Sequence, residues 1–183
     1  FVYDKSIKMD TLRFLKDKMH IAETDSVIPG GRYHNRRDYM GFPSLGRDDL
    51  QYQKISALPV KGFNLNGSIL EQIAQKDYMI YTPYQTFSYV INFLKEAALD
   101  PQVRRIKLTV YRLANNSQVA AALINAAKNG KEVTVQIELQ ARFDEQANIK
   151  YANQFQEEGI RLIFGIPGLK VHTKVCFIER EEV

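Results

Sequence analysis

From about residue 77 onward the chain alternates between two hydrophobic periods, and this alternation constrains its fold more than any other feature. We predict strands, most of them with apolar residues at every second position, over residues 78–81, 106–110, 133–139, 160–164 and 171–178. Helices are predicted over residues 87–98 and 145–158, and between Ser117, which can cap a helix, and Gly130, which can end it. These strand–helix–strand repeats indicate an α/β fold with a mainly parallel sheet and right-handed crossovers.

The last predicted strand cannot run parallel to its predecessor, because the connection between them is too short. Only residues 165–170 separate the two, whereas a parallel return needs a crossover of roughly a dozen residues or more. We therefore expect an antiparallel last strand in a mixed, mainly parallel sheet. Its first residues then lie at the carboxyl ends of the other strands, the edge at which such sheets bind ligands.

Basic and nucleophilic side chains are predicted to meet at this edge. Arg112 and Arg142 each follow one of the parallel strands, and His172 stands at the start of the last strand. In the pattern Lys-x-His-x-Lys, residues Lys170 and Lys174 share one strand face with His172 if the extended conformation reaches Lys170. Two ammonium groups favour a neutral, nucleophilic imidazole and attract phosphate oxygens. The set indicates a phosphoryl-transfer site in which charge stabilisation does most of the catalysis.

Each of these residues also has a structural interpretation. A single histidine in a strand is usually structural, and the two lysines could simply be solvated. Arg112 and Arg142 could be surface ion-pair partners, which for Arg142 would be Asp144 or Glu145. Cys176 has apolar neighbours, so we expect a buried thiol without a catalytic role.

Residues 1–58 differ in character from the rest. Asp10 can cap a helix over residues 11–19, and Ile28-Pro29-Gly30-Gly31 is a turn signal. A stretch rich in Gly, Pro, Ser and Asn follows, so we predict domains over residues 1–58 and 59–183.

The composition excludes several classes of protein. The 183 residues carry a net charge of +4, which permits a polyanionic partner but does not require one. The single cysteine excludes an internal disulfide framework. No apolar run approaches the ~20 residues of a membrane helix, and no signal peptide is visible. The chain starts at Phe1 without a methionine and stops directly after a predicted strand, so we expect an internal piece of a longer protein.

Several motifs resemble the catalytic core of the polyphosphate kinase family, in the order of that family. They are residues 111–112 (YR), 141–145 (ARFDE), 147–149 (ANI) and 168–174 (GLKVHTK). Residues 28–35 (IPGGRYHN) resemble the end of the family's head domain. The resemblance implies a phospholipase D-like α/β domain, with helices flanking a mixed, mainly parallel sheet, preceded by part of an α+β head domain.

The resemblance also implies a mechanism. His172 would take the γ-phosphate of ATP as phosphohistidine and pass it to inorganic polyphosphate, and the reverse reaction would convert ADP to ATP. Mg²⁺ would accompany the nucleotide. Arg112 and Arg142 match the family's magnesium and phosphate positions; a guanidinium has no lone pair, so we expect them to hold phosphate oxygens that the metal also touches. Lys170 and Lys174 would bind phosphate as well, and the contacts to the nucleotide base would lie outside this chain.

For the full-length protein the resemblance implies a homo-oligomer with a cytoplasmic location, and membrane association is left open. We expect no transmembrane segment and no nucleic-acid partner. The family's second histidine should lie beyond Val183, so we expect the isolated chain to be inactive or nearly so as a kinase. Two alternatives stay open. A phospholipase D-type phosphodiesterase is disfavoured by Glu179, which stands where the superfamily signature has Asp. A non-catalytic polyanion-binding module would not need a histidine between two lysines.

Overall fold

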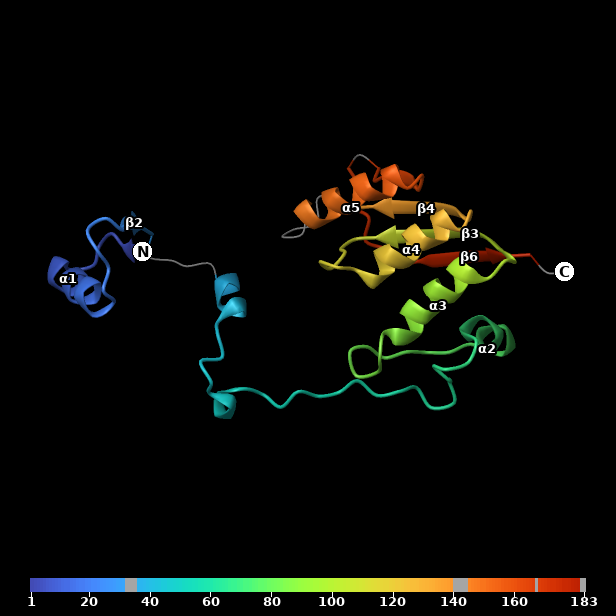
Figure 1. Cartoon of the computed structure of the whole chain (residues 1–183), viewed down its shortest axis with the longest axis horizontal. Coiled ribbons are helices and arrows are strands. Elements are labelled where there is room, and N and C mark those ends of the chain that lie inside the picture. Colours follow the sequence, from blue (N-terminus) through green and yellow to red (C-terminus); the bar gives the residue numbers. More distant parts are fainter. Residues whose placement is uncertain (32–35, 140–144, 167, 182–183) are drawn as a thin grey trace. The chain divides into compact units, whose positions relative to one another are not determined.

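The computed structural model describes residues 1–31, 36–139, 145–166 and 168–181. The chain forms two compact units, Phe1–Lys54 and Ile55–Val183. Figure 1 labels most of their helices and strands. No helix within the described ranges is both long enough and apolar enough to cross a membrane.

The unit Phe1–Lys54 is built on a short parallel strand pair. Its elements are β1 (Val2–Asp4), α1 (Met9–Lys18), β2 (Ile28–Gly30), which pairs with β1, and two 3-10 helices (Arg36–Gly41 and Asp48–Leu50). Two predictions were wrong here. Part of the predicted turn at residues 28–31 is the strand β2, and Asp10 does not cap α1, because the N-cap is Lys8. Asp10 instead lies in the first turn, where a carboxylate interacts favourably with the helix dipole.

The unit Ile55–Val183 contains the predicted mixed sheet. Its strands are β3 (Val103–Val110), β4 (Glu132–Ile137), β5 (Arg161–Phe164) and β6 (Cys176–Arg180), in the order β5-β4-β3-β6. Strands β3, β4 and β5 are parallel, and β6 runs antiparallel to β3 (Figure 1). The α/β class and the antiparallel direction of the last strand are therefore confirmed.

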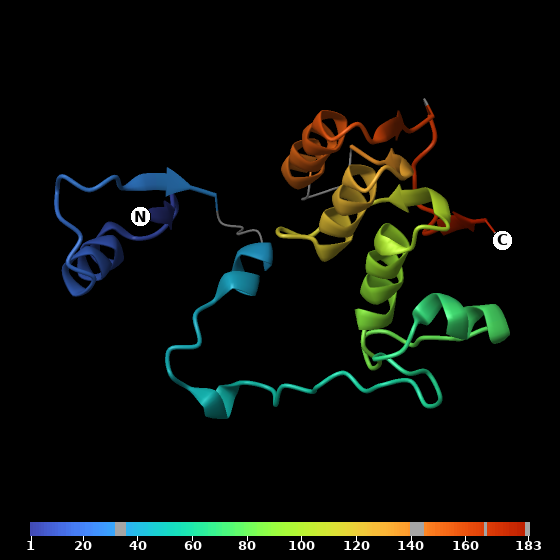
Figure 2. The same ribbon diagram turned by 45° about the vertical axis from the view of Figure 1, so that its right-hand side comes forward.

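Helices cover one face of this sheet. They are α3 (Ser88–Leu99), α4 (Gln118–Lys128) and α5 (Glu145–Glu157), while the shorter α2 (Ile69–Gln75) packs on α3. Figure 2 shows α3, α4 and α5 gathered on one side of the strands. The Ser117 hydroxyl accepts a hydrogen bond from the Ala120 N–H at 3.3 Å, as predicted for the cap of α4. Gly130 follows the end of α4 with φ +78°, a conformation that favours glycine.

The main core lies between these helices and the sheet. Alternate strand residues such as Val135 and Ile137 are fully buried against Leu123 of α4 and Phe155 of α5. Each such side chain contributes about 1.5–3 kcal/mol relative to an exposed one. The intervening residues Lys107 and Glu132 point to the opposite, polar face. The period-two pattern therefore positions β3 and β4, and with them their carboxyl ends.

Two predicted strand regions were wrong. Residues 78–81 form no strand; Tyr78 instead stacks on Phe63, with ring centroids 3.9 Å apart, in a small aromatic cluster with Tyr89. The last strand begins at Cys176 rather than at residue 171. The reason is the side chain of Thr109. Its hydroxyl donates a hydrogen bond to the Thr173 carbonyl and accepts one from the Val175 N–H, so these two backbone groups ahead of β6 do not join a regular ladder.

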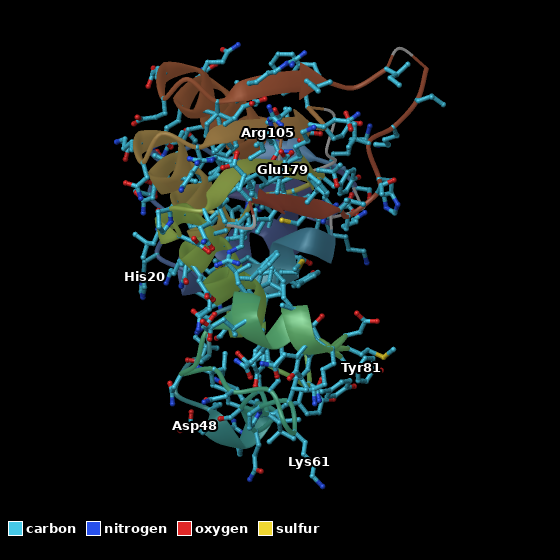
Figure 3. The ribbon with its side chains drawn as sticks, turned by 90° about the vertical axis from the view of Figure 1, so that its right-hand side faces the viewer. His20, Asp48, Lys61, Tyr81, Arg105 and Glu179 are labelled. Carbon is cyan, nitrogen blue, oxygen red and sulfur yellow. The ribbon has the colours of Figure 1, made fainter. Side chains whose placement is uncertain are left out.

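An ion-pair network ties three strands together on the polar face. Arg105 of β3 donates to Glu132 of β4 at 2.7 Å and to Glu179 of β6 at 2.9 Å. Figure 3 shows Arg105 and Glu179 close together across the sheet. Glu179, the residue that departs from the phospholipase D signature, thus has a structural partner.

Candidate active site

The candidate site is assembled around the side chain of Tyr111, which directly follows β3. The imidazole of His172 meets this ring edge-on, with centroids 5.4 Å apart and an interplanar angle of 72°. His172 is exposed and Tyr111 is half-buried. The chain thus brings the predicted nucleophile to the carboxyl end of β3. The ring beside it belongs to Tyr111, for which no role was predicted from the sequence.

Three of the predicted cations surround the same ring. The guanidinium carbon of Arg112 lies 5.4 Å from the Tyr111 centroid, and the Nζ atoms of Lys170 and Lys174 lie 5.8 and 5.2 Å from it. All three side chains are exposed, so they can reach a ligand in solvent. The fourth predicted cation, Arg142, lies outside the described residues.

The predicted reason for the clustering was only partly right. Lys170, His172 and Lys174 were expected on one face of a strand, but residues 170–175 precede β6 and form no strand. Their side chains meet around Tyr111 instead. The ammonium group of Lys174 also donates a hydrogen bond to the backbone carbonyl of His172.

The segment that carries His172 is held on both sides of that residue. On one side, the backbone N–H of Val171 donates to the buried carboxylate of Glu138 at 3.0 Å. On the other, the Thr109 hydroxyl donates to the Thr173 carbonyl at 2.5 Å and accepts from the Val175 N–H at 2.9 Å. These bonds fix the backbone of an otherwise irregular segment, which positions His172 without a regular ladder.

Asn148 of α5 ties together the strand ends that carry the site. It is fully buried, and its amide NH₂ donates to the carbonyls of Tyr111 and Glu138, both at 2.8 Å. Its carbonyl oxygen accepts from the Leu113 N–H at 3.2 Å. Both N–H donors and the carbonyl oxygen of this buried amide are thus hydrogen-bonded, and they join the segments after β3 and β4 to the helix. Glu138 and Asn148 were not predicted as site residues; the only signal was Asn148 in the motif at residues 147–149.

A cavity of ≈ 550 Å³ opens beside Arg112 and Lys174. Tyr111, Arg112 and Lys174 form its polar side, and apolar side chains of α3 and β3, such as Val90 and Leu108, form the rest. Cys176 also lines it, but burial raises the pKa of its thiol to about 11. The thiol is therefore protonated at neutral pH. Cys176 was expected to be buried, and it is half-buried; its lack of a catalytic role stays a prediction.

Within the described ranges, no group of three His, Cys, Asp or Glu side chains that could hold a metal ion is found. The guanidinium of Arg112 has no lone pair to donate. Arg112 therefore fits a phosphate oxygen and not the metal itself.

Comparisons with known proteins place the chain in a family. The family described as "Polyphosphate kinase C-terminal domain 1" matches residues 68–183. The chain is 42% identical to the polyphosphate kinase of Vibrio vulnificus (strain YJ016), over 100% of this chain and 26% of that protein. It is 41% identical to the polyphosphate kinase of Escherichia coli (strain K12), over 100% of this chain and 27% of that protein.

A solved structure agrees with these relatives. The crystal structure of polyphosphate kinase from Porphyromonas gingivalis matches with a TM-score of 0.67 and 37% identity, over 100% of this chain and 28% of that one. The chain thus spans about a quarter of the length of the relatives it matches. On the evidence of both its sequence and its fold, this chain belongs to the polyphosphate kinase family.

Proposed function

We propose that this chain carries part of the active site for reversible transfer of the ATP γ-phosphate to inorganic polyphosphate, through a phosphohistidine at His172. The observation that supports this most is the arrangement around Tyr111. An exposed imidazole and three cationic side chains, from segments about sixty residues apart in sequence, lie within 6 Å of the centroid of one ring.

This arrangement suits phosphoryl transfer. Such reactions need little covalent chemistry from the protein, and catalysis comes mainly from positioning and from stabilising charge on the phosphate oxygens. His172 offers a nucleophilic ring nitrogen. The backbone on either side of this residue is held by hydrogen bonds at Val171 and Thr173. Arg112, Lys170 and Lys174 offer N–H donors to the oxygens.

The proposed reaction has two balanced steps. In the first, a ring nitrogen of His172 attacks the γ-phosphorus, an N–P bond forms, the bond from that phosphorus to the bridging oxygen breaks, and ADP leaves. In the second, a terminal oxygen of polyphosphate attacks the same phosphorus. A new P–O–P link forms, the N–P bond breaks, and the neutral imidazole is restored. Synthesis of ATP from polyphosphate is the reverse sequence.

The complete reaction needs parts of the protein that this chain lacks, because the chain is about a quarter of the length of its relatives. We therefore assign the activity to the full-length protein and expect little or none from the isolated chain. Mg²⁺ is proposed as a companion of the nucleotide phosphates, and no step is assigned to it. A homo-oligomer and a cytoplasmic location remain part of the proposal for the full-length protein.

The test is covalent labelling of the full-length protein. The protein is incubated with Mg²⁺ and γ-³²P-ATP, and the label is tested for the acid lability and alkali stability of phosphohistidine. We expect label in the wild type and none in His172→Ala. His20→Asn is the matched control, because His20 is an exposed histidine of the other unit whose φ of +53° asparagine tolerates. A folded, ATP-binding wild type without label would contradict the proposal and direct attention to phosphodiester substrates.

A further inference from the structure

We propose that Tyr111 is a positioning residue whose aromatic ring gathers Arg112, Lys170 and Lys174 and orients His172, so that the site is organised for a polyphosphate before one binds. This inference rests on the proposed function and gives it a structural basis. The group that acts is the ring itself, and the proposal assigns no role to the hydroxyl.

The first argument is geometric. Aromatic rings attract cations to their faces at centroid distances below about 6 Å. Arg112, Lys170 and Lys174 all fall within that distance of Tyr111, at 5.4, 5.8 and 5.2 Å. His172 meets the same ring at an interplanar angle of 72°, the edge-on arrangement that aromatic pairs favour. One ring thus meets the four described side chains that were predicted for the site, His172 and the three cations.

The second argument concerns repulsion. Three cations gathered at one place repel one another, and exposed lysine and arginine side chains have many rotamers in which to move apart. The electron-rich face of an uncharged ring offsets this repulsion without neutralising any charge. A carboxylate in the same place would hold the cations equally well, but it would also repel phosphate. An aromatic ring therefore suits a site that must hold its cations together and still attract a polyanion.

The third argument is that the backbone that carries the ring is held. The carbonyl of Tyr111 accepts a hydrogen bond from the fully buried Asn148, and the following residues run directly into buried Leu113. Tyr78 is a described tyrosine with a lysine over its ring, Lys76 at 4.9 Å, but it stacks within an aromatic cluster. Tyr111 therefore differs in meeting several cations from an anchored position.

Cations held in this way favour ligands with several linked phosphates over a single phosphate. A lysine ammonium has three N–H donors and a guanidinium has five. The Lys174 ammonium already donates to the His172 carbonyl, and a ring face does not replace N–H donors as a partner for phosphate. Donors gathered around one ring can contact neighbouring phosphates of the same chain. Freely moving side chains would first have to be ordered by the ligand, and that cost lowers affinity.

The test uses the full-length protein, with inorganic tripolyphosphate as the probe and calorimetry at fixed salt as the measurement. Tyr111→Phe keeps the ring, and we expect its Kd within about twofold of the wild type. Tyr111→Leu removes the ring, and we expect a Kd about tenfold higher, because each of three exposed cation–π contacts changes an equilibrium constant by about twofold. Tyr84→Leu is the control, since Tyr84 is an exposed tyrosine that pairs with Tyr81.

A graded series keeps the proposal testable if Tyr111→Leu does not fold. Phenylalanines with one, two and three ring fluorines at residue 111 keep the shape of the ring but progressively remove the negative charge of its face. We expect the Kd for tripolyphosphate to rise with each fluorine, and the labelling rate of His172 at saturating ATP to fall. A Kd that does not change along the series, or a Tyr111→Leu variant that binds as the wild type does, would overturn the proposal.

These outcomes differ from those that would refute the proposed function. A protein that binds tripolyphosphate with a graded dependence on fluorination, but never carries label on His172, supports the role of the ring and contradicts the phosphohistidine. A protein that is labelled on His172, but whose Kd for tripolyphosphate does not change with fluorination, supports the phosphohistidine and contradicts the role of the ring.

Discussion

The carboxylate of Glu138 accepts a hydrogen bond at 3.0 Å from the backbone N–H of Val171, the residue before His172. Glu138 directly follows β4, and its own N–H donates to the carbonyl of Val110 at the end of β3. One buried side chain therefore links the sheet edge to the segment that carries the proposed nucleophile.

Replacing Glu138 should disturb His172 without touching it. Glu138→Ala leaves the buried Val171 N–H without its acceptor, which costs about 1–3 kcal/mol of stability. Labelling of His172 should slow by more than tenfold, whereas Glu138→Gln, which keeps an acceptor oxygen, should retain more of the rate. Urea unfolding and rapid-quench labelling measure the two effects, with the exposed Glu157→Ala as the control. Equal labelling rates in all of these variants would show that the bond does not position His172.

Asn148 should be the most sensitive polar residue of the core. Asn148→Ala leaves the carbonyls of Tyr111 and Glu138 and the N–H of Leu113 without their partner, so we expect a loss of about 3 kcal/mol. Asn148→Asp keeps the size but replaces the two donors by an anion facing two carbonyls, and it should be at least as harmful. The free energy of unfolding from urea titration measures both, and a loss below about 0.5 kcal/mol would contradict the bonding described here.

Acid sensitivity should depend partly on Asp100. Burial raises the pKa of this carboxyl, but hydrogen bonds from Arg180 and from the Gln102 N–H, both at 2.8 Å, lower it more, so the net shift is downward. A lowered pKa in the folded state contributes stability that is present above the unfolded-state pKa of about 3.9 and is lost as the pH falls through the folded value.

We therefore expect Asp100→Asn to be less stable than the wild type at pH 7, by about 1 kcal/mol. Between pH 5 and pH 2 the variant should lose less stability than the wild type, so that the two curves converge. Thermal unfolding across this range measures the difference. Parallel curves for the two proteins would show that Asp100 does not carry this part of the pH dependence.

Arg112 should affect phosphate affinity and not the requirement for metal. Arg112→Gln removes a charge that we assign to phosphate oxygens, so the KM for polyphosphate should rise about tenfold and its dependence on ionic strength should weaken. The Mg²⁺ concentration that gives half-maximal labelling should not change, because a guanidinium is no metal ligand. A large shift in that concentration with an unchanged KM would contradict the assignment.

The strand and helix periods and the length of the connections predicted the strand directions at the site more reliably than the local conformation there. The short connection at residues 165–170 was sufficient to predict the antiparallel β6, because chain length alone excludes a parallel return. The start of that strand was misplaced, since Thr109 competes for its backbone groups through a side-chain contact that no periodic pattern reveals.

The residues of the candidate site fall into two groups, those that were predicted from the sequence and those that only the structure reveals. His172, Lys170, Lys174 and Arg112 were predicted from position and charge. The roles of Tyr111, Glu138 and Asn148 depend on contacts between segments that are distant in sequence, and a single sequence does not show these. Membership of the phospholipase D-like superfamily and the domain division at residues 58 and 59 stay predictions.

The most direct test of the central claim is a pulse–chase on the full-length protein. His172 is first labelled with γ-³²P-ATP, free nucleotide is removed, and unlabelled inorganic polyphosphate is added. The account predicts that label leaves the protein and enters polyphosphate at a rate no slower than the overall turnover. Label that stays on the protein, or that is released only as orthophosphate while polyphosphate synthesis proceeds with ATP, would contradict a phosphohistidine on the reaction path.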